Sequence, residues 1–121
     1  MPDRDSKVGP TVAVELTPRG RAAVAVVLVA GPGAVSAVEA CFLPASGKRI
    51  ADAPVDRILL GRWGGADGEE LIVCRRANGT VEVHSHGGFA AVQNVIERLC
   101  AHGCKAMRWQ DWARQTVSDP I

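Results

Sequence analysis

A run of nine apolar residues, Ala22 to Ala30, limits the folds open to this chain more than any other segment. It is about half as long as the stretch that a helix needs to cross a bilayer. Residues 23–30 are rich in valine and show no alternation of apolar and polar side chains. A short β-branched run of this kind is typical of a strand covered on both faces. The run therefore predicts a central strand, and the rest of the chain must supply its neighbours and its cover.

Further strands are predicted on both sides of this run. Alternating side chains predict a strand at residues 11–17. A hairpin turn is predicted at Asn78-Gly79, because both residues tolerate a positive φ. Residues 56–84 are therefore expected to form an antiparallel meander, whose three strands are predicted at 57–63, 69–76 and 80–84.

Two helices are predicted from apolar residues at helical spacing. The first covers residues 34–41. The second covers residues 89–102, and Gly103 follows it at the position where a left-handed residue ends a helix. Its apolar stripe is expected to bury five side chains, which are Phe89, Val92, Ile96, Leu99 and Cys100.

The segments outside these elements are expected to be shorter or irregular. Residues 43–54 contain two prolines and predict a connecting loop, with a short strand around Arg49-Ile50. A last strand is predicted at 104–109, and a helix is expected to begin at 111–115 without packing on anything. That abrupt finish suggests that the chain was cut from a longer one.

This order of elements predicts an α+β domain with a mixed sheet of five to six strands and two main helices on one face. The chain has 121 residues, which is the size of one domain. We expect residues 1–10 to be a flexible lead-in, residues 11–116 to be the single domain, and residues 117–121 to be a tail at a truncation point.

The charge balance argues against direct binding of nucleic acid by this chain. The chain has 14 Lys and Arg against 13 Asp and Glu, whereas domains that bind phosphate backbones usually carry a large basic excess. The first residues are polar and contain no signal-peptide core, so we expect a cytoplasmic protein without membrane contact. Four scattered cysteines do not make a disulfide framework, and a buried thiol is expected at Cys100.

The densest group of chemically active residues lies at 82–88. Glu82, His84 and His86 are two residues apart and would share one face of a strand. Such a face can bind a metal, serve as acid and base, or simply be a polar sheet surface. Gly87-Gly88 then precedes a helix, where free N–H groups suit an anion but glycines also allow a sharp turn. Trp109 and Trp112 are expected to cover an edge of the core or to meet a second domain.

No catalytic constellation or nucleotide-binding motif emerges from the residues themselves, which favours a binding or assembly domain. Two segments, however, resemble the tRNA-modification GTPases called MnmE or TrmE. Residues 17–32 read T-P-R-G-R-A-A-V-A-V-V-L-V-A-G-P and are similar to that family's first hairpin. Residues 81–88 read V-E-V-H-S-H-G-G and look like its [VL]-E-[IL]-x-x-H-G-G segment. The resemblance extends from Thr11 to Arg114.

The resemblance implies the fold of the family's N-terminal domain, which is akin to the folate-binding domain of the glycine-cleavage aminomethyltransferase. It implies a homodimer and 5-formyl-tetrahydrofolate as candidate cofactor. The GTPase and helical domains, with their GTP, Mg and K, would lie in a parent protein beyond this chain. The cofactor-binding residues that carry over are Arg21, Glu82, His86, Gly87 and Gly88, with Arg21 as the partner of the folate's glutamate tail.

Two expected folate contacts are replaced in this chain. Leu28 stands where the family has a strand arginine, and Asn78 stands near the position of a glutamate. The resemblance therefore predicts that the chain retains the family's fold but has a changed cofactor site. Our leading hypothesis is a non-catalytic dimerisation domain of a TrmE-like protein that modifies wobble uridine in tRNA. The alternatives are a stand-alone folate-dependent one-carbon transferase and a metal-binding module that uses His84 and His86.

Overall fold

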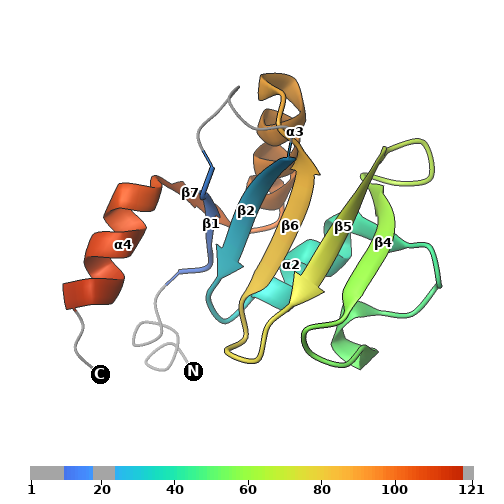
Figure 1. Cartoon of the computed structure of the whole chain (residues 1–121), viewed down its shortest axis with the longest axis horizontal. Coiled ribbons are helices and arrows are strands. Elements are labelled where there is room, and N and C mark those ends of the chain that lie inside the picture. Colours follow the sequence, from blue (N-terminus) through green and yellow to red (C-terminus); the bar gives the residue numbers. More distant parts are fainter. Residues whose placement is uncertain (1–9, 18–23, 119–121) are drawn as a thin grey trace.

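One mixed sheet organises the computed structural model, which describes residues 10–17 and 24–118 (Figure 1). Its seven strands stand in the order β3-β4-β5-β6-β2-β1-β7. All neighbours are antiparallel except β1 and β7, which are parallel. The strands are β1 Val12–Glu15, β2 Val24–Ala30, β3 Phe42–Pro44, β4 Ile58–Trp63, β5 Glu69–Arg75, β6 Val81–His86 and β7 Lys105–Met107. The α+β class and the central place of the apolar run, now β2, are confirmed.

Two helices cover one face of the sheet and a third packs on the other. Helices α2 (Ala34–Cys41) and α3 (Phe89–Ala101) lie behind the sheet in Figure 1. Helix α4 (Trp109–Ser118) lies beside β1. The two predicted helices match α2 and α3, and Gly103 has the expected positive φ, at 98°.

The main core lies between the sheet and the α2–α3 layer. Alternate residues of the strands point into it, because successive side chains of a strand point to opposite faces. The buried contributors from the two central strands and α3 are Ala25, Val27, Val29, Val81, Val83, Val92, Val95, Ile96 and Leu99. Full burial of a valine or leucine contributes about 1.5–3 kcal/mol, so this layer accounts for much of the stability.

The opposite side of the sheet, which we call the open face, is covered only in part. Trp112 of α4 packs there against a small cluster of Val12, Val14 and Leu28. Elsewhere on this face large apolar side chains stay exposed, and they are Leu16, Val24, Leu43, Ile58 and Leu60. An antiparallel sheet that faces water usually shows polar residues there, so this composition is unusual for a solvated surface.

The structure corrects the expectations for residues 43–54. No strand forms at Arg49-Ile50; a single 3-10 turn, η1, covers Ile50–Asp52 instead. One strand was not predicted: β3 begins at Phe42, extends into the predicted loop as far as Pro44, and pairs with β4. Pro44 lies at its end, where a missing N–H does not interrupt the ladder.

Two other expectations also need correction. The C-terminal helix does pack, since Trp112 contacts the small cluster on the open face. Phe89 is 62% exposed and Cys100 is exposed, so neither belongs to the buried stripe of α3. That stripe runs through Val92, Val95, Ile96 and Leu99, and Cys100 is turned about 100° from Leu99. Cys41, Cys74 and Cys104 are buried.

Candidate functional site

Strand β6 places its polar side chains on the open face, as the alternation predicted. Val81 and Val83 are buried under the helices, whereas Glu82 and His84 point the other way. His86 lies at the end of the strand, opposite Val24, and its Nε2 is 3.4 Å from Glu69 Oε2. Glu82 and His86 are about 13 Å apart, four residues at about 3.3 Å each. Glu82 and His86 therefore do not form a single site.

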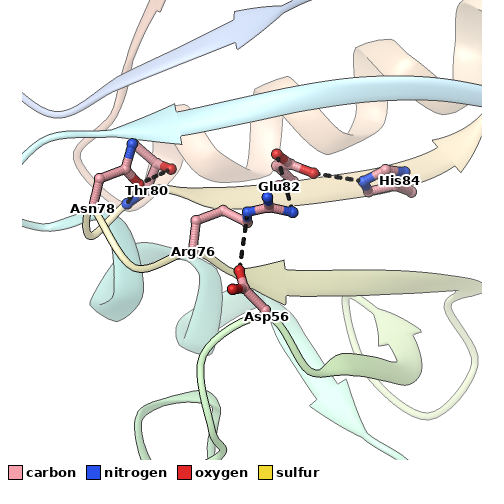
Figure 2. A network of polar contacts seen from close by, with 6 residues as sticks. All are labelled: Asp56, Arg76, Asn78, Thr80, Glu82 and His84. Carbon is pink, nitrogen blue, oxygen red and sulfur yellow. Dashed lines mark hydrogen bonds and ion pairs between the residues drawn. The ribbon is translucent and has the colours of Figure 1, made fainter.

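A row of charged groups runs from Asp56 across Arg76 to Glu82 and His84 (Figure 2). Arg76 Nε is 3.2 Å from Asp56 Oδ1, and Arg76 Nη1 is 3.9 Å from Glu82 Oε2. Glu82 Oε1 is 3.1 Å from His84 Nε2. Asp56 and then Glu82 raise the pKa of the Arg76 guanidinium above its ordinary value. The row thus contains two carboxylates and one permanent cation, with His84 at its end.

Local backbone structure brings Asp56 and Arg76 together. Asp56 has a φ of 65°, a left-handed conformation that is uncommon for a non-glycine residue, and its N–H donates to Arg75 O at 2.7 Å. Arg76 precedes the Asn78-Gly79 hairpin, whose Gly79 has a φ of 87° as expected. The Thr80 hydroxyl donates to Asn78 Oδ1 at 2.7 Å and fixes the turn (Figure 2).

These groups form the polar wall of a hollow of about 510 Å³ on the open face. Its apolar wall comes from three large side chains, one directly after β1, one on β2 and one on α4. The lining residues are Leu16, Leu28, Trp112, Asp56, Arg76, Ala77, Asn78, Thr80 and Glu82. A concave site with one apolar wall and a few convergent polar groups is the usual setting for a small ligand.

The structure brings some of the predicted site residues together and separates others. Glu82 lines the hollow, and so do Leu28 and Asn78, the two positions where the resemblance implied replaced contacts. Gly87 and Gly88 lie at the far end of β6, where Gly88 precedes α3 without a side-chain cap. Arg21 lies outside the described residues.

Sequence reasoning missed Asp56 and Arg76. Their positions in the sequence gave a usable signal, because Asp56 precedes one predicted strand and Arg76 ends the next. In an antiparallel pair the start of one strand lies beside the end of the other, so these two residues are brought close together.

The described part of the chain offers no group of three His, Cys, Asp or Glu side chains arranged to hold a metal ion. His84 and His86 instead each contact a carboxylate, Glu82 and Glu69 respectively. Among the described helices, none is long and apolar enough to cross a membrane.

Comparison with known proteins decides the family. The tRNA modification GTPase MnmE of Carboxydothermus hydrogenoformans is 33% identical over 106 aligned residues, covering 78% of this chain and 23% of that protein. The tRNA modification GTPase MnmE of Salinibacter ruber is 34% identical over 105 residues, covering 78% of this chain and 22% of that protein. No family model matches the chain. This chain belongs to the MnmE family.

The chain spans about a quarter of the length of the curated MnmE relatives that it matches, 23% for both the Carboxydothermus and the Geobacillus kaustophilus proteins. Its sheet and helices are consistent with the MnmE-type domain that the resemblance implied.

The described lining of the hollow can be compared with the charges of 5-formyl-tetrahydrofolate, the cofactor that the resemblance implies. A folate carries a glutamate tail with two carboxylates, which need cationic partners. Among the described lining residues Arg76 is the one cation, and it already lies between Asp56 and Glu82. Leu28, at 6% exposure, adds only hydrocarbon to the wall. The anionic end of a folate therefore lacks a partner in the described part of the hollow.

Proposed function

We propose that this domain pairs two copies of a tRNA-modifying protein of the MnmE type through the open face of its sheet. The observation that carries this proposal is the set of five exposed large apolar side chains on that face, Leu16, Val24, Leu43, Ile58 and Leu60. The pairing would position the parts of such a protein that bind GTP and act on tRNA, while this domain holds the two copies together.

The outer half of the face carries the strongest support. Ile58 and Leu60 of β4 are 64% and 48% exposed, and Leu43 of β3 is 49% exposed. The register places Leu43 next to Leu60, because Leu43 is paired with Arg62. Contiguous exposed apolar side chains of this kind mark interaction surfaces in soluble proteins.

The polar residues around this patch suit a self-complementary contact. Arg62 and Glu70 are directly opposite each other on β4 and β5, and both are exposed. A two-fold axis through the patch can place each Arg62 near the Glu70 of the other copy, because a two-fold interface uses the same surface twice. The balanced charge avoids the repulsion that a one-signed surface would produce between identical copies.

The proposal is tested by the mass of the 121-residue chain in solution. We expect a dimer by light scattering, and a monomer when Ile58→Glu and Leu60→Glu are combined. Each of these side chains contributes about 1.5–3 kcal/mol when buried, so the double variant should weaken the dimer by at least about a hundredfold.

Phe89→Glu is the matched control, because Phe89 is as exposed as Ile58 but lies at the start of α3 on the helix-covered side. It should remain a dimer. A wild-type monomer at high protein concentration, or a dimer that survives the double variant, contradicts the proposal.

A further inference from the structure

The tip of the β5–β6 hairpin carries an Asn-Gly pair, in which the backbone nitrogen of the glycine can attack the asparagine side chain. Asn78 and Gly79 are both exposed. Because glycine has no Cβ, it leaves its own nitrogen unshielded. A Cβ built at Gly79 would meet no atom within 4 Å, so the described residues leave this nitrogen accessible. The chain has one other asparagine, Asn94, which lies within α3.

Two backbone hydrogen bonds close the turn around this pair. The Arg76 N–H donates to Thr80 O at 2.8 Å, and the Gly79 N–H donates to Arg76 O at 3.0 Å. Gly79 has a φ of 87°, which glycine adopts without strain. The Gly79 N–H must leave its acceptor before its nitrogen attacks, and opening one such exposed bond slows the attack by about two- to tenfold. The turn therefore delays the reaction without preventing it.

Thr80 holds the side-chain oxygen on which the attack would place negative charge. Its backbone N–H donates to Asn78 Oδ1 at 3.2 Å, and its hydroxyl donates to the same oxygen at 2.7 Å (Figure 2). Hydrogen-bond donors aimed at an oxygen that becomes charged stabilise the transition state. A side chain bonded to the N–H two residues on is also folded back along the chain, toward the peptide between them. The contacts with Thr80 therefore favour the attack both electrostatically and by position.

We propose that Asn78 is a site of self-modification, at which the turn converts the side-chain amide into a carboxylate with the help of Thr80. The Gly79 nitrogen forms a bond to Asn78 Cγ, and the bond from Cγ to Nδ2 breaks. The proton of the Gly79 nitrogen passes through solvent to Nδ2, which leaves as ammonia. Water then opens the resulting imide ring and leaves aspartate or isoaspartate at position 78. The sum consumes one water and releases one ammonia, and no group is oxidised or reduced.

The reaction changes the charge of the hollow on the open face. Asn78 lines this hollow. So do Asp56, Arg76 and Glu82, among which two carboxylates face one guanidinium. A carboxylate at position 78 adds a further negative charge, so the modified chain should elute later from an anion exchanger. This inference goes beyond the pairing of two copies and does not depend on it.

Incubation of the 121-residue chain at mildly alkaline pH, followed by peptide mapping with mass spectrometry, tests the site. We expect Asn78 to lose its amide at least about tenfold faster than Asn94, which is the internal control. Asn94 is also exposed, so access to water does not distinguish the two. The nitrogen that follows Asn94 belongs to Val95, is bonded within the helix and is shielded by a β-branched side chain. Isoaspartate, which marks the imide route, is detected with a protein isoaspartate methyltransferase.

Two variants of Thr80 separate its help from the exposure of the turn. Thr80→Val keeps the size of the side chain but cannot donate, and it should slow the loss of the Asn78 amide by about two- to tenfold. Thr80→Ser keeps the hydroxyl and should react at the wild-type rate. Both variants retain the backbone N–H at position 80, so the difference between them reports the hydroxyl alone. If Thr80→Val does not fold, Thr80→Ala replaces it with the same expected result.

Equal rates at Asn78 and Asn94, a modified position 78 without isoaspartate, or a wild-type or faster rate in the variant that lacks the hydroxyl would each overturn the inference. Asn78→Asp serves as the charge reference, because it carries the added carboxylate from the start. It should elute from the anion exchanger together with the aspartate form of the incubated wild-type chain. A modified wild-type chain that elutes with the unmodified one contradicts the change of charge.

Discussion

At the scale of single residues, the polar groups of the open face are held by one another. Arg76 bridges Asp56 and Glu82, and Glu82 also contacts His84. The alternation of β6 was enough to predict that Glu82 and His84 share a face. The pairing with Asp56 was not predictable, because it depends on a left-handed Asp56 and on the β4–β5 register.

The cysteines show the same limit of sequence reasoning. Helical periodicity placed Cys100 on the buried stripe, yet α3 turns it to solvent. Burial raises the pKa of the Cys41 thiol to about 11, and burial likewise raises that of Cys104 to about 11. The environment of each thiol therefore follows from packing rather than from spacing alone.

We predict that iodoacetamide at pH 8 modifies Cys100 first in the folded protein. At that pH a thiol with a pKa near 11 is only about 0.1% thiolate, and the thiolate is the reactive form. Peptide mapping by mass spectrometry over time gives the order of modification, and Cys100→Ala should remove the early adduct. Labelling of Cys41 or Cys104 as fast as Cys100 contradicts this assignment of burial.

At the scale of elements, β3 is the strand that the sequence did not reveal. It has three residues, follows α2 directly and contains Pro44, so it shows none of the alternation that marks longer strands. A signal was nevertheless present in β4, because a glycine inside a strand often marks a close backbone approach. A Cβ at Gly61 would lie 2.4 Å from Leu43 O and 2.5 Å from the Phe42 ring.

We predict that Gly61→Ala destabilises the protein by about 1–3 kcal/mol, since β3 or the Phe42 ring must move to admit the methyl group. Urea unfolding followed by circular dichroism measures the change. Gly88→Ala is the matched control, because its Cβ would meet open space and its φ of −66° suits any residue. Equal stability of both variants contradicts the close approach of β3 to β4.

At the scale of the whole molecule, the composition of one face of the sheet could be predicted from the sequence much better than that of the other. The helix-covered face could be foreseen from three local patterns, which are the apolar run of β2, the alternation of β6 and the apolar stripes of α2 and α3. The composition of the open face depends on strand order and on where α4 packs. Neither of these can be predicted from the pattern of a short sequence segment. Leu43, Ile58 and Leu60 come from two strands and become one patch only when β3 joins β4.

The central claim is that this patch is the contact between two copies, and isotope-filtered NMR on a mixture of labelled and unlabelled chains tests it most directly. We expect intermolecular NOEs from the methyl groups of Leu43, Ile58 and Leu60. Their absence at concentrations where the protein is a dimer, or intermolecular NOEs confined to Phe89 and α3, would contradict the account.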